Sequence, residues 1–169
     1  HYKQPFDLRD MNILVLGGSI SSLEVASDQA MMGKGRVYLA QRRQRYVMPK
    51  MIAGVPLEFF AFSLEGALAL DTATKQEVLD GAKEFLELFG GNPSRYGAPP
   101  PHEDMEKAGV TGSQHYLNLV AEDRIDVRPW VERIDGKRVI FTDGSTAEVD
   151  AVVIGTGFDL HLPFLSDDI

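Results

Sequence analysis

The most constraining feature of this sequence is a short apolar run that ends in a glycine-rich turn and leads into a helical pattern. Residues 12–16 have the continuous apolar character of a strand buried in a parallel sheet. The helical pattern extends from Ser21 to about Met32 and stops at Gly33, and residues 36–40 form a second apolar run. This order predicts a βαβ unit. We therefore expect an α/β, Rossmann-like, three-layer dinucleotide-binding domain.

The last part of the sequence has the pattern of a β-meander followed by one more buried strand. Asp-Gly pairs at positions 135–136 and 143–144 are typical of hairpin turns, and they divide residues 131–149 into three short runs. Residues 151–154 are a final apolar run. We expect the meander to belong to the same domain as the βαβ unit.

The middle of the chain is read as helix and loop. Residues 41–50 are basic and irregular, and residues 74–89 have the spacing of an amphipathic helix with Phe85 and Phe89 on its apolar face. Residues 92–101 are rich in proline, so they are expected to form a loop.

Composition narrows the classes of partner and chemistry. The 169 residues include 17 basic and 25 acidic side chains, for a net charge of −8, which argues against nucleic acid or an anionic membrane as the main partner. The absence of cysteine excludes disulfides, thiolate metal sites and a cysteine nucleophile. No apolar run approaches the ~20 residues of a membrane span. We expect one cytoplasmic domain.

The glycine-rich turn has the composition of a phosphate-binding turn. A dinucleotide site needs a tight turn that brings backbone N–H groups to a pyrophosphate at a helix N-terminus. The candidate residues are Gly17, Gly18, Ser19, Ser21 and Ser22. Ser19 and Ser22 stand where the GxGxxG pattern has its second and third glycines, and serine is small and can donate to phosphate. The alternative is that the glycines only end the strand and that Ser21 or Ser22 caps the helix.

The residues after the second strand favour NADP(H) over NAD. An NAD site places an acidic residue there for the ribose 2′-hydroxyl, whereas an NADP site places arginine against the 2′-phosphate. This sequence has Gln41, Arg42 and Arg43 and no carboxylate at that place. Arginine offers a planar fork of donors to a phosphate. The alternative is a solvated basic face.

Other chemistry-bearing residues are not arranged as a site. His102, His115 and His161 show no metal-ligand spacing with carboxylates, and no nucleophile–base arrangement is visible. Trp130 and Phe158 are expected to serve packing. We therefore predict no metal site and no catalytic residue in this chain.

Six segments in order resemble the flavin-containing monooxygenases and their bacterial flavoprotein relatives. They are residues 2–5 with 12–18, residues 40–48, residues 96–99, residues 124–129, residues 140–145, and residues 155–158 with 162–165. The last segment resembles the family's ATG(Y/F)…PFL signature, with Gly155 in place of its alanine. Two further departures lie in the phosphate turn, where serines replace glycines and Ile20 replaces an asparagine common in the family.

The resemblance implies an enzyme with two dinucleotide-binding domains. In that family NADPH reduces FAD, and a flavin hydroperoxide then oxygenates a small organic substrate. The matching positions imply that Arg42 meets the 2′-phosphate and that Thr156 and Gly157 belong to the cofactor site. The family's own FAD-binding glycine motif has no counterpart in this sequence. We therefore expect residues 1–169 to be a single NADP(H)-binding domain of a longer polypeptide whose FAD domain completes the enzyme, and the chain alone to be inactive.

Two other functions remain open at this point. One is a domain of an FAD-dependent pyridine-nucleotide reductase, which has the same paired domains. The other is a non-catalytic NADP-binding module whose phosphate turn has diverged through its serines.

Overall fold

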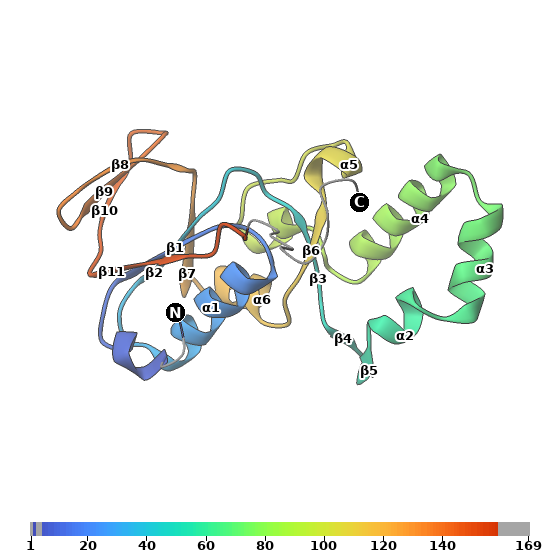
Figure 1. The fold of residues 1–169 in the computed structure, drawn as a ribbon, viewed down its shortest axis with the longest axis horizontal. Coiled ribbons are helices and arrows are strands. Elements are labelled where there is room, and N and C mark those ends of the chain that lie inside the picture. Colours follow the sequence, from blue (N-terminus) through green and yellow to red (C-terminus); the bar gives the residue numbers. More distant parts are fainter. Residues whose placement is uncertain (1, 3–4, 159–169) are drawn as a thin grey trace, which may run out of the picture.

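The computed structural model describes Tyr2 and residues 5–158. Residues 3–4 of the first family-like segment and residues 162–165 of the last therefore lie outside the described residues. Figure 1 shows the β-meander at one end and three helices extending from the other. In chain order the elements are η1 (Pro5–Leu8), β1 (Ile13–Leu16), α1 (Ile20–Met32), β2 (Val37–Ala40), β3 (Tyr46–Met48), β4 (Met51–Ile52), β5 (Val55–Pro56), α2 (Glu58–Ala61), α3 (Leu64–Thr72), α4 (Lys75–Leu88), η2 (Pro93–Tyr96), α5 (Met105–Ala108), β6 (Val110–Gly112), α6 (Tyr116–Ala121), β7 (Ile125–Arg128), β8 (Val131–Asp135), β9 (Arg138–Phe141), β10 (Thr146–Glu148) and β11 (Ala151–Ile154).

A four-stranded parallel sheet in the order β11-β1-β2-β7 organises the domain. Its central strand β1 is apolar throughout because both faces of the sheet are covered. Ile13 and Val15 pack with residues of α1 and α6, whereas Leu14 packs with the meander. The alternation follows from the period of two residues in a strand, which sends neighbouring side chains to opposite faces.

The domain has three layers, as the sequence predicted. Helices α1 and α6 cover one face of the parallel sheet, with Leu23 and Tyr116 in the shared core. The antiparallel sheet β10-β9-β8 covers the other face through Val139 and Phe141. The expected α/β, Rossmann-like fold with a β-meander is confirmed, and helix α1 begins one residue before the expected Ser21.

The basic stretch at residues 41–50 is not irregular throughout, which corrects the sequence prediction. It contains strand β3, which pairs in parallel with β6, and Tyr46 is opposite Val110. All three residues of β3 are buried. The local sequence does not indicate this strand, because its partner strand lies more than sixty residues along the chain and because arginines flank it.

The predicted amphipathic helix is α4, and its boundary residues follow local rules. Thr74 is the N-cap and forms a capping box with Glu77, in which each side chain accepts from the other residue's backbone N–H. The buried residue of α4 is Leu86, and Phe85 is half-buried. Phe89 is 38% exposed, and its ring lies 4.5 Å from that of Phe85, so the two share one face of the helix and this face is only partly covered. Within the described part of the chain, no helix has the length and apolar character needed to cross a membrane.

Candidate functional site

The carboxyl ends of β1, β2 and β11 lie at one edge of the parallel sheet, and a cavity of about 1260 Å³ opens there. Such an edge, where the chain leaves neighbouring strands toward opposite sides, is where α/β folds bind ligands. The cavity is lined by all ten residues that the sequence singled out: Gly17, Gly18, Ser19, Ser21, Ser22, Gln41, Arg42, Arg43, Thr156 and Gly157. Residues from three separate segments therefore meet at one place.

The turn after β1 requires glycine at its first position. Gly17 has a φ of +127°, which side chains rarely allow. A Cβ on Gly17 would also lie closer than 3.0 Å to the Gly155 carbonyl oxygen and to Ser22 Oγ. The backbone N–H of Gly17 donates to the Ala40 carbonyl oxygen at 2.9 Å, which ties the turn to the end of β2.

Helix α1 points its N-terminus at the cavity. Its N-cap is Ser19, so the alternative that Ser21 or Ser22 caps the helix is wrong. The Ser19 side chain makes no capping hydrogen bond, and the first turn holds no acidic residue. The first backbone N–H groups of any helix lack intrahelical acceptors, and the helix dipole adds positive potential there. This end of α1 can therefore bind an anion.

Ser22 lines the cavity but directs its hydroxyl into the protein. Its side chain is 1 % exposed, and Oγ donates to the Gly155 carbonyl oxygen at 2.9 Å. The Leu16 carbonyl oxygen lies 3.5 Å away. The hydroxyl therefore joins the start of α1 to the end of β11.

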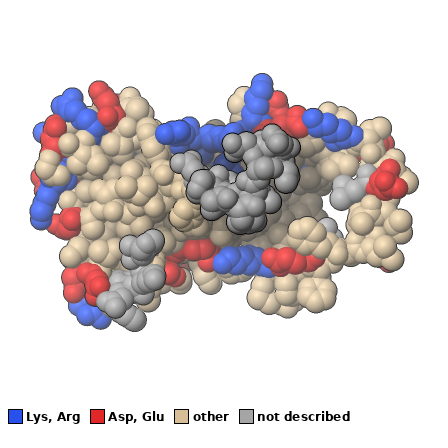
Figure 2. Space-filling view, viewed as in Figure 1, with Lys and Arg blue, Asp and Glu red and all other residues tan. Residues whose placement is uncertain are grey.

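The charge around the cavity is positive. Arg42, Arg43 and Arg45 line it, and none of the lining residues within the described chain is acidic. The Arg42 guanidinium lies over the Trp130 ring, 4.7 Å from its centroid. Arg43 Nη1 donates to the Lys107 carbonyl oxygen at 3.0 Å. On the face drawn in Figure 2, basic side chains gather along the upper middle of the molecule, whereas acidic ones are spread over it.

Trp130 is a site residue that the sequence reasoning missed. It was expected to serve packing, yet it lines the cavity and stacks with Arg42. The available signal was its position just after β7, which is the neighbour of β2 in the parallel sheet. Phe158 was also expected to pack, and it is 98 % exposed, so that expectation is wrong.

Gln41 lines the cavity, but its side-chain amide is engaged within the protein. It is buried, and its amide donates to the Gln44 side chain. A Cβ on Gly18 would lie 2.6 Å from Gln41 Oε1, so the turn and Gln41 are in close contact. Burial raises the pKa of the nearby Tyr116 hydroxyl, which the amides of Gln44 and Gln41 partly oppose. Tyr116 therefore stays protonated at neutral pH.

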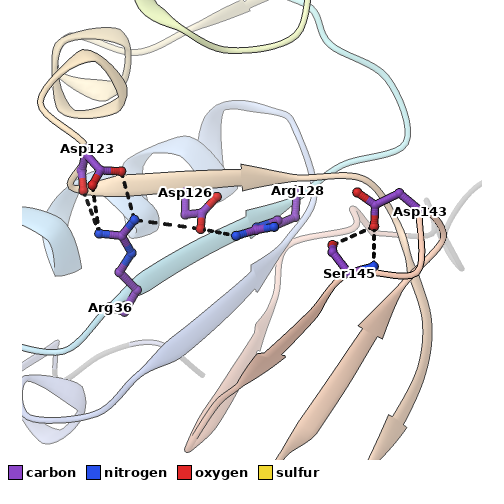
Figure 3. A network of polar contacts seen from close by, with 6 residues as sticks. All are labelled: Arg36, Asp123, Asp126, Arg128, Asp143 and Ser145. Atoms are coloured by element: carbon purple, nitrogen blue, oxygen red, sulfur yellow. Dashed lines mark hydrogen bonds and ion pairs between the residues drawn. The ribbon is translucent and has the colours of Figure 1, made fainter.

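A second polar cluster lies at the edge strand β7 (Figure 3), and within it the buried Arg128 Nε has no hydrogen-bond partner among the described residues. Arg36 Nη2 lies 2.9 Å from Asp123 Oδ1, and Asp126 Oδ2 lies 2.6 Å from Arg128 Nη2. Hydrogen bonding to Asp123 raises the pKa of Arg36. Charged side chains beside an edge strand discourage its pairing with other chains. Among the described residues, no group of three or more His, Asp or Glu side chains is placed to hold a metal ion.

The sequence matches known proteins over its whole length. The family model described as flavin-binding monooxygenase-like matches residues 1–169. Flavin-containing monooxygenase 5 of Oryctolagus cuniculus is 24% identical over 173 residues, covering 99% of this chain and 31% of that protein. Trimethylamine monooxygenase of Roseovarius nubinhibens is 40% identical over 95 residues, covering 56% of this chain and 20% of that protein. The chain thus spans about a third of the length of a relative that it matches end to end.

Solved structures share the fold at low sequence identity. Cyclohexanone monooxygenase has a TM-score of 0.59 at 15% identity, over 90% of this chain and 41% of that one. Steroid monooxygenase bound to NADP has a TM-score of 0.54 at 15% identity, over 90% and 39%. The fold likeness agrees with the match to the family model. It also extends to a bacillithiol disulfide reductase of Staphylococcus aureus, with a TM-score of 0.51 at 14% identity, over 97% of this chain and 33% of that one. With the glycine-rich turn and the strand order already described, the match across all 169 residues means that the chain belongs to the flavin-binding monooxygenase-like family.

Proposed function

We propose that residues 1–169 form a single NADP(H)-binding domain of a flavin-dependent monooxygenase. In such an enzyme NADPH supplies the hydride that reduces FAD, and the reduced flavin activates oxygen for transfer to a small organic substrate. The FAD domain would belong to the same polypeptide, in keeping with relatives about three times as long as this chain. The cytoplasm is the location expected from the sequence.

The observation that carries this proposal is the charge of the cavity. In a chain of net charge −8, three arginines and no acidic side chain among the described residues line the space at the N-terminus of α1. A pyrophosphate and a 2′-phosphate are the anions that a dinucleotide would bring to these two positions. A solvated basic face would not need a cavity or a turn that excludes a Cβ.

Each part of the site has a proposed role. The backbone N–H groups of Gly18, Ser19 and Ser21 would hold the pyrophosphate, because these residues line the cavity at the positive end of α1. Arg42 would hold the 2′-phosphate. Its face rests on Trp130, and among the described residues no carbonyl or carboxylate is paired with it, so the donors on its edge are available to a ligand. Thr156 and Gly157 would form the opposite rim.

The test is a ratio of affinities for two ligands that differ only in the 2′-phosphate. We expect the 169-residue chain to bind 2′-phospho-ADP-ribose roughly ten- to a hundredfold more tightly than ADP-ribose, because hydrogen bonds to charged groups contribute about 1.5–3 kcal/mol. Arg42→Ala should remove most of this preference, and Arg42→Lys should keep only part of it because lysine lacks the bidentate fork. Isothermal titration at low and high salt measures both affinities.

Arg133→Ala is the matched control, because Arg133 pairs with Asp135 on the meander and does not line the cavity. It should leave the ratio unchanged. Equal affinity for the two ligands, or a preference that survives Arg42→Ala combined with Arg43→Ala, would contradict the proposal.

A further inference from the structure

A hydrogen bond between α1 and the end of β11 joins two positions where this chain departs from the pattern of the family that it resembles. Ser22 Oγ donates to the Gly155 carbonyl oxygen at 2.9 Å, although the two residues are 133 positions apart in the sequence. A Cβ on Gly155 would lie closer than 3.0 Å to Ser22 Oγ, a separation that real Cβ atoms do not show. The presence of the serine hydroxyl therefore requires that position 155 carry no side chain.

Space alone, and not backbone conformation, excludes a side chain at Gly155. Its φ lies outside the left-handed region that favours glycine, unlike the φ of +127° at Gly17. The neighbour that blocks a Cβ is the Ser22 side chain, and the next nearest group outside it, the Leu16 carbonyl oxygen, would be 3.3 Å away. Removing the Ser22 side chain would therefore relieve the severe clash with alanine at position 155 and leave a tight contact with Leu16 that needs a shift of a few tenths of an ångström.

The same hydroxyl also borders the phosphate turn. A Cβ on Gly17 would meet both Ser22 Oγ and the Gly155 carbonyl oxygen. Ser22 thus lies where three segments converge: the turn, the first turn of α1, and the end of β11. Its side chain is 1 % exposed, so its hydroxyl is engaged inside this junction rather than directed at a ligand.

We propose that Ser22 and Gly155 form a coupled pair in which the buried serine hydroxyl fastens the phosphate turn to β11, so that Ser22 is a positioning residue and does not donate to the pyrophosphate. The consequence for the ligand rests on the proposed function. The coupling between the two residues does not, because it follows from their packing alone.

The coupling predicts that the effect of Ser22→Gly on the melting temperature changes sign when position 155 carries alanine. Gly155→Ala alone overpacks the junction and should lower the melting temperature by about 4–10 °C. Ser22→Gly alone removes a hydrogen bond and adds a glycine to a helix, so it should lower the melting temperature by about 2–6 °C. In the Gly155→Ala background, however, Ser22→Gly should raise the melting temperature because it removes the clash.

Ligand affinity separates positioning from direct donation. The double variant Ser22→Gly with Gly155→Ala has no hydroxyl at position 22. If Ser22 only positions the turn, the methyl group of the alanine at position 155 takes the place of the hydroxyl in the junction, so ADP-ribose should bind about tenfold more weakly to Gly155→Ala and to Ser22→Gly and return to within about threefold of the wild-type affinity in the double variant. If the hydroxyl contacts the pyrophosphate, the double variant should bind as weakly as Ser22→Gly or more weakly.

Two controls match the chemical changes. Gly81 lies in α4 with nothing within 4 Å of a built Cβ, so Gly81→Ala should not lower the melting temperature. Ser27 is a buried serine of α1, the helix that contains Ser22, and its hydroxyl donates to the Leu23 carbonyl oxygen. Ser27→Gly should therefore add to Gly155→Ala and should not rescue it.

The experiment is thermal unfolding of the four chains of the cycle and the controls, with titration of each by ADP-ribose. Additive losses of melting temperature would overturn the coupled pair. A stability rescue without recovery of affinity would overturn the positioning role. If Gly155→Ala does not fold, a folded double variant supports the pair and an unfolded one contradicts it. If the wild-type chain binds neither ADP-ribose nor its 2′-phosphate, the proposed function fails and the positioning role with it, while the thermal cycle still decides the pair.

Discussion

The parallel sheet and the helical arm formed by α2, α3 and α4 place their apolar side chains in opposite environments. Leu14 and Leu39 in the sheet have no exposed surface, whereas Phe62 and Leu88 in the arm are 85 % and 77 % exposed. Figure 1 shows the reason, since layers cover both faces of the sheet while the arm extends away from it. Both regions carry large apolar side chains, but those of the sheet are buried and those of the arm are largely exposed, so burial decides where the stabilisation lies.

The apolar contact between the arm and the rest of the domain lies near the end of α4. Leu86 of α4 packs with Tyr46 and Met48 of β3 and with Ala108 of α5. A cavity of about 300 Å³ lies beside this contact, lined by Met48, Phe85 and Leu86 among others. The contact is therefore apolar, and it is less densely packed than the core around β1.

The largest expected difference between the two regions comes from a leucine in each. Leu39→Ala should lower the free energy of unfolding by about 3–5 kcal/mol, because a fully buried side chain is lost and a cavity is left. Leu88→Ala should change it by less than about 0.5 kcal/mol, because Leu88 is already exposed. Denaturant unfolding of both variants measures the difference. Losses of similar size would break the comparison.

A substitution at the root of the arm should have an intermediate effect. Leu86→Ala removes a buried side chain that borders an existing cavity, so fewer contacts are lost than at Leu39. We expect a loss of about 2–3 kcal/mol. Leu88→Ala, two residues along the same helix, is the control for changes in helix propensity. A loss at Leu86 as large as that at Leu39 would mean that the arm is packed as tightly as the sheet.

The smallest expected effect is the part of the pH dependence that Asp150 contributes in the sheet region. Asp150 accepts from Lys137 Nζ at 2.7 Å and from the Asn12 backbone N–H at 3.0 Å, which links the meander to the start of β1. The hydrogen bond from Lys137, followed by that from Asn12, lowers the pKa of Asp150 below its usual 3.8. A lowered pKa stabilises the fold above pH 3.8, and this stability is lost as the pH falls through the folded-state pKa.

Melting temperatures at pH 6 and at pH 2.5 test this dependence. The wild-type chain should lose more stability between the two values than Asp150→Asn, which lacks the titrating carboxyl. Asp80→Asn in the arm removes a carboxyl that accepts from Gln76 within the same helix, and it controls for loss of one negative charge. An identical acid loss in wild type and Asp150→Asn would rule out the link as a source of acid sensitivity.

Most of the fold could be predicted from the sequence because its signals are local. The apolar runs of β1, β2 and β11, the helical spacing of α1 and the two Asp-Gly turns of the meander each lie within a few residues. The site residues could be predicted for a related reason. The carboxyl ends of neighbouring parallel strands meet at one edge, so residues that follow β1, β2 and β11 must come together once the strand order is right.

What only the tertiary structure decided are the features that depend on partners far along the chain. Strand β3 lies within a basic stretch and forms because β6 pairs with it. Trp130 becomes part of the cavity because β7 lies beside β2 and brings it under Arg42. Ser22 reads as a phosphate ligand in sequence, yet its hydroxyl donates to Gly155. The direction of a side chain depends on which backbone lies nearest, and that is settled only when distant segments pack together.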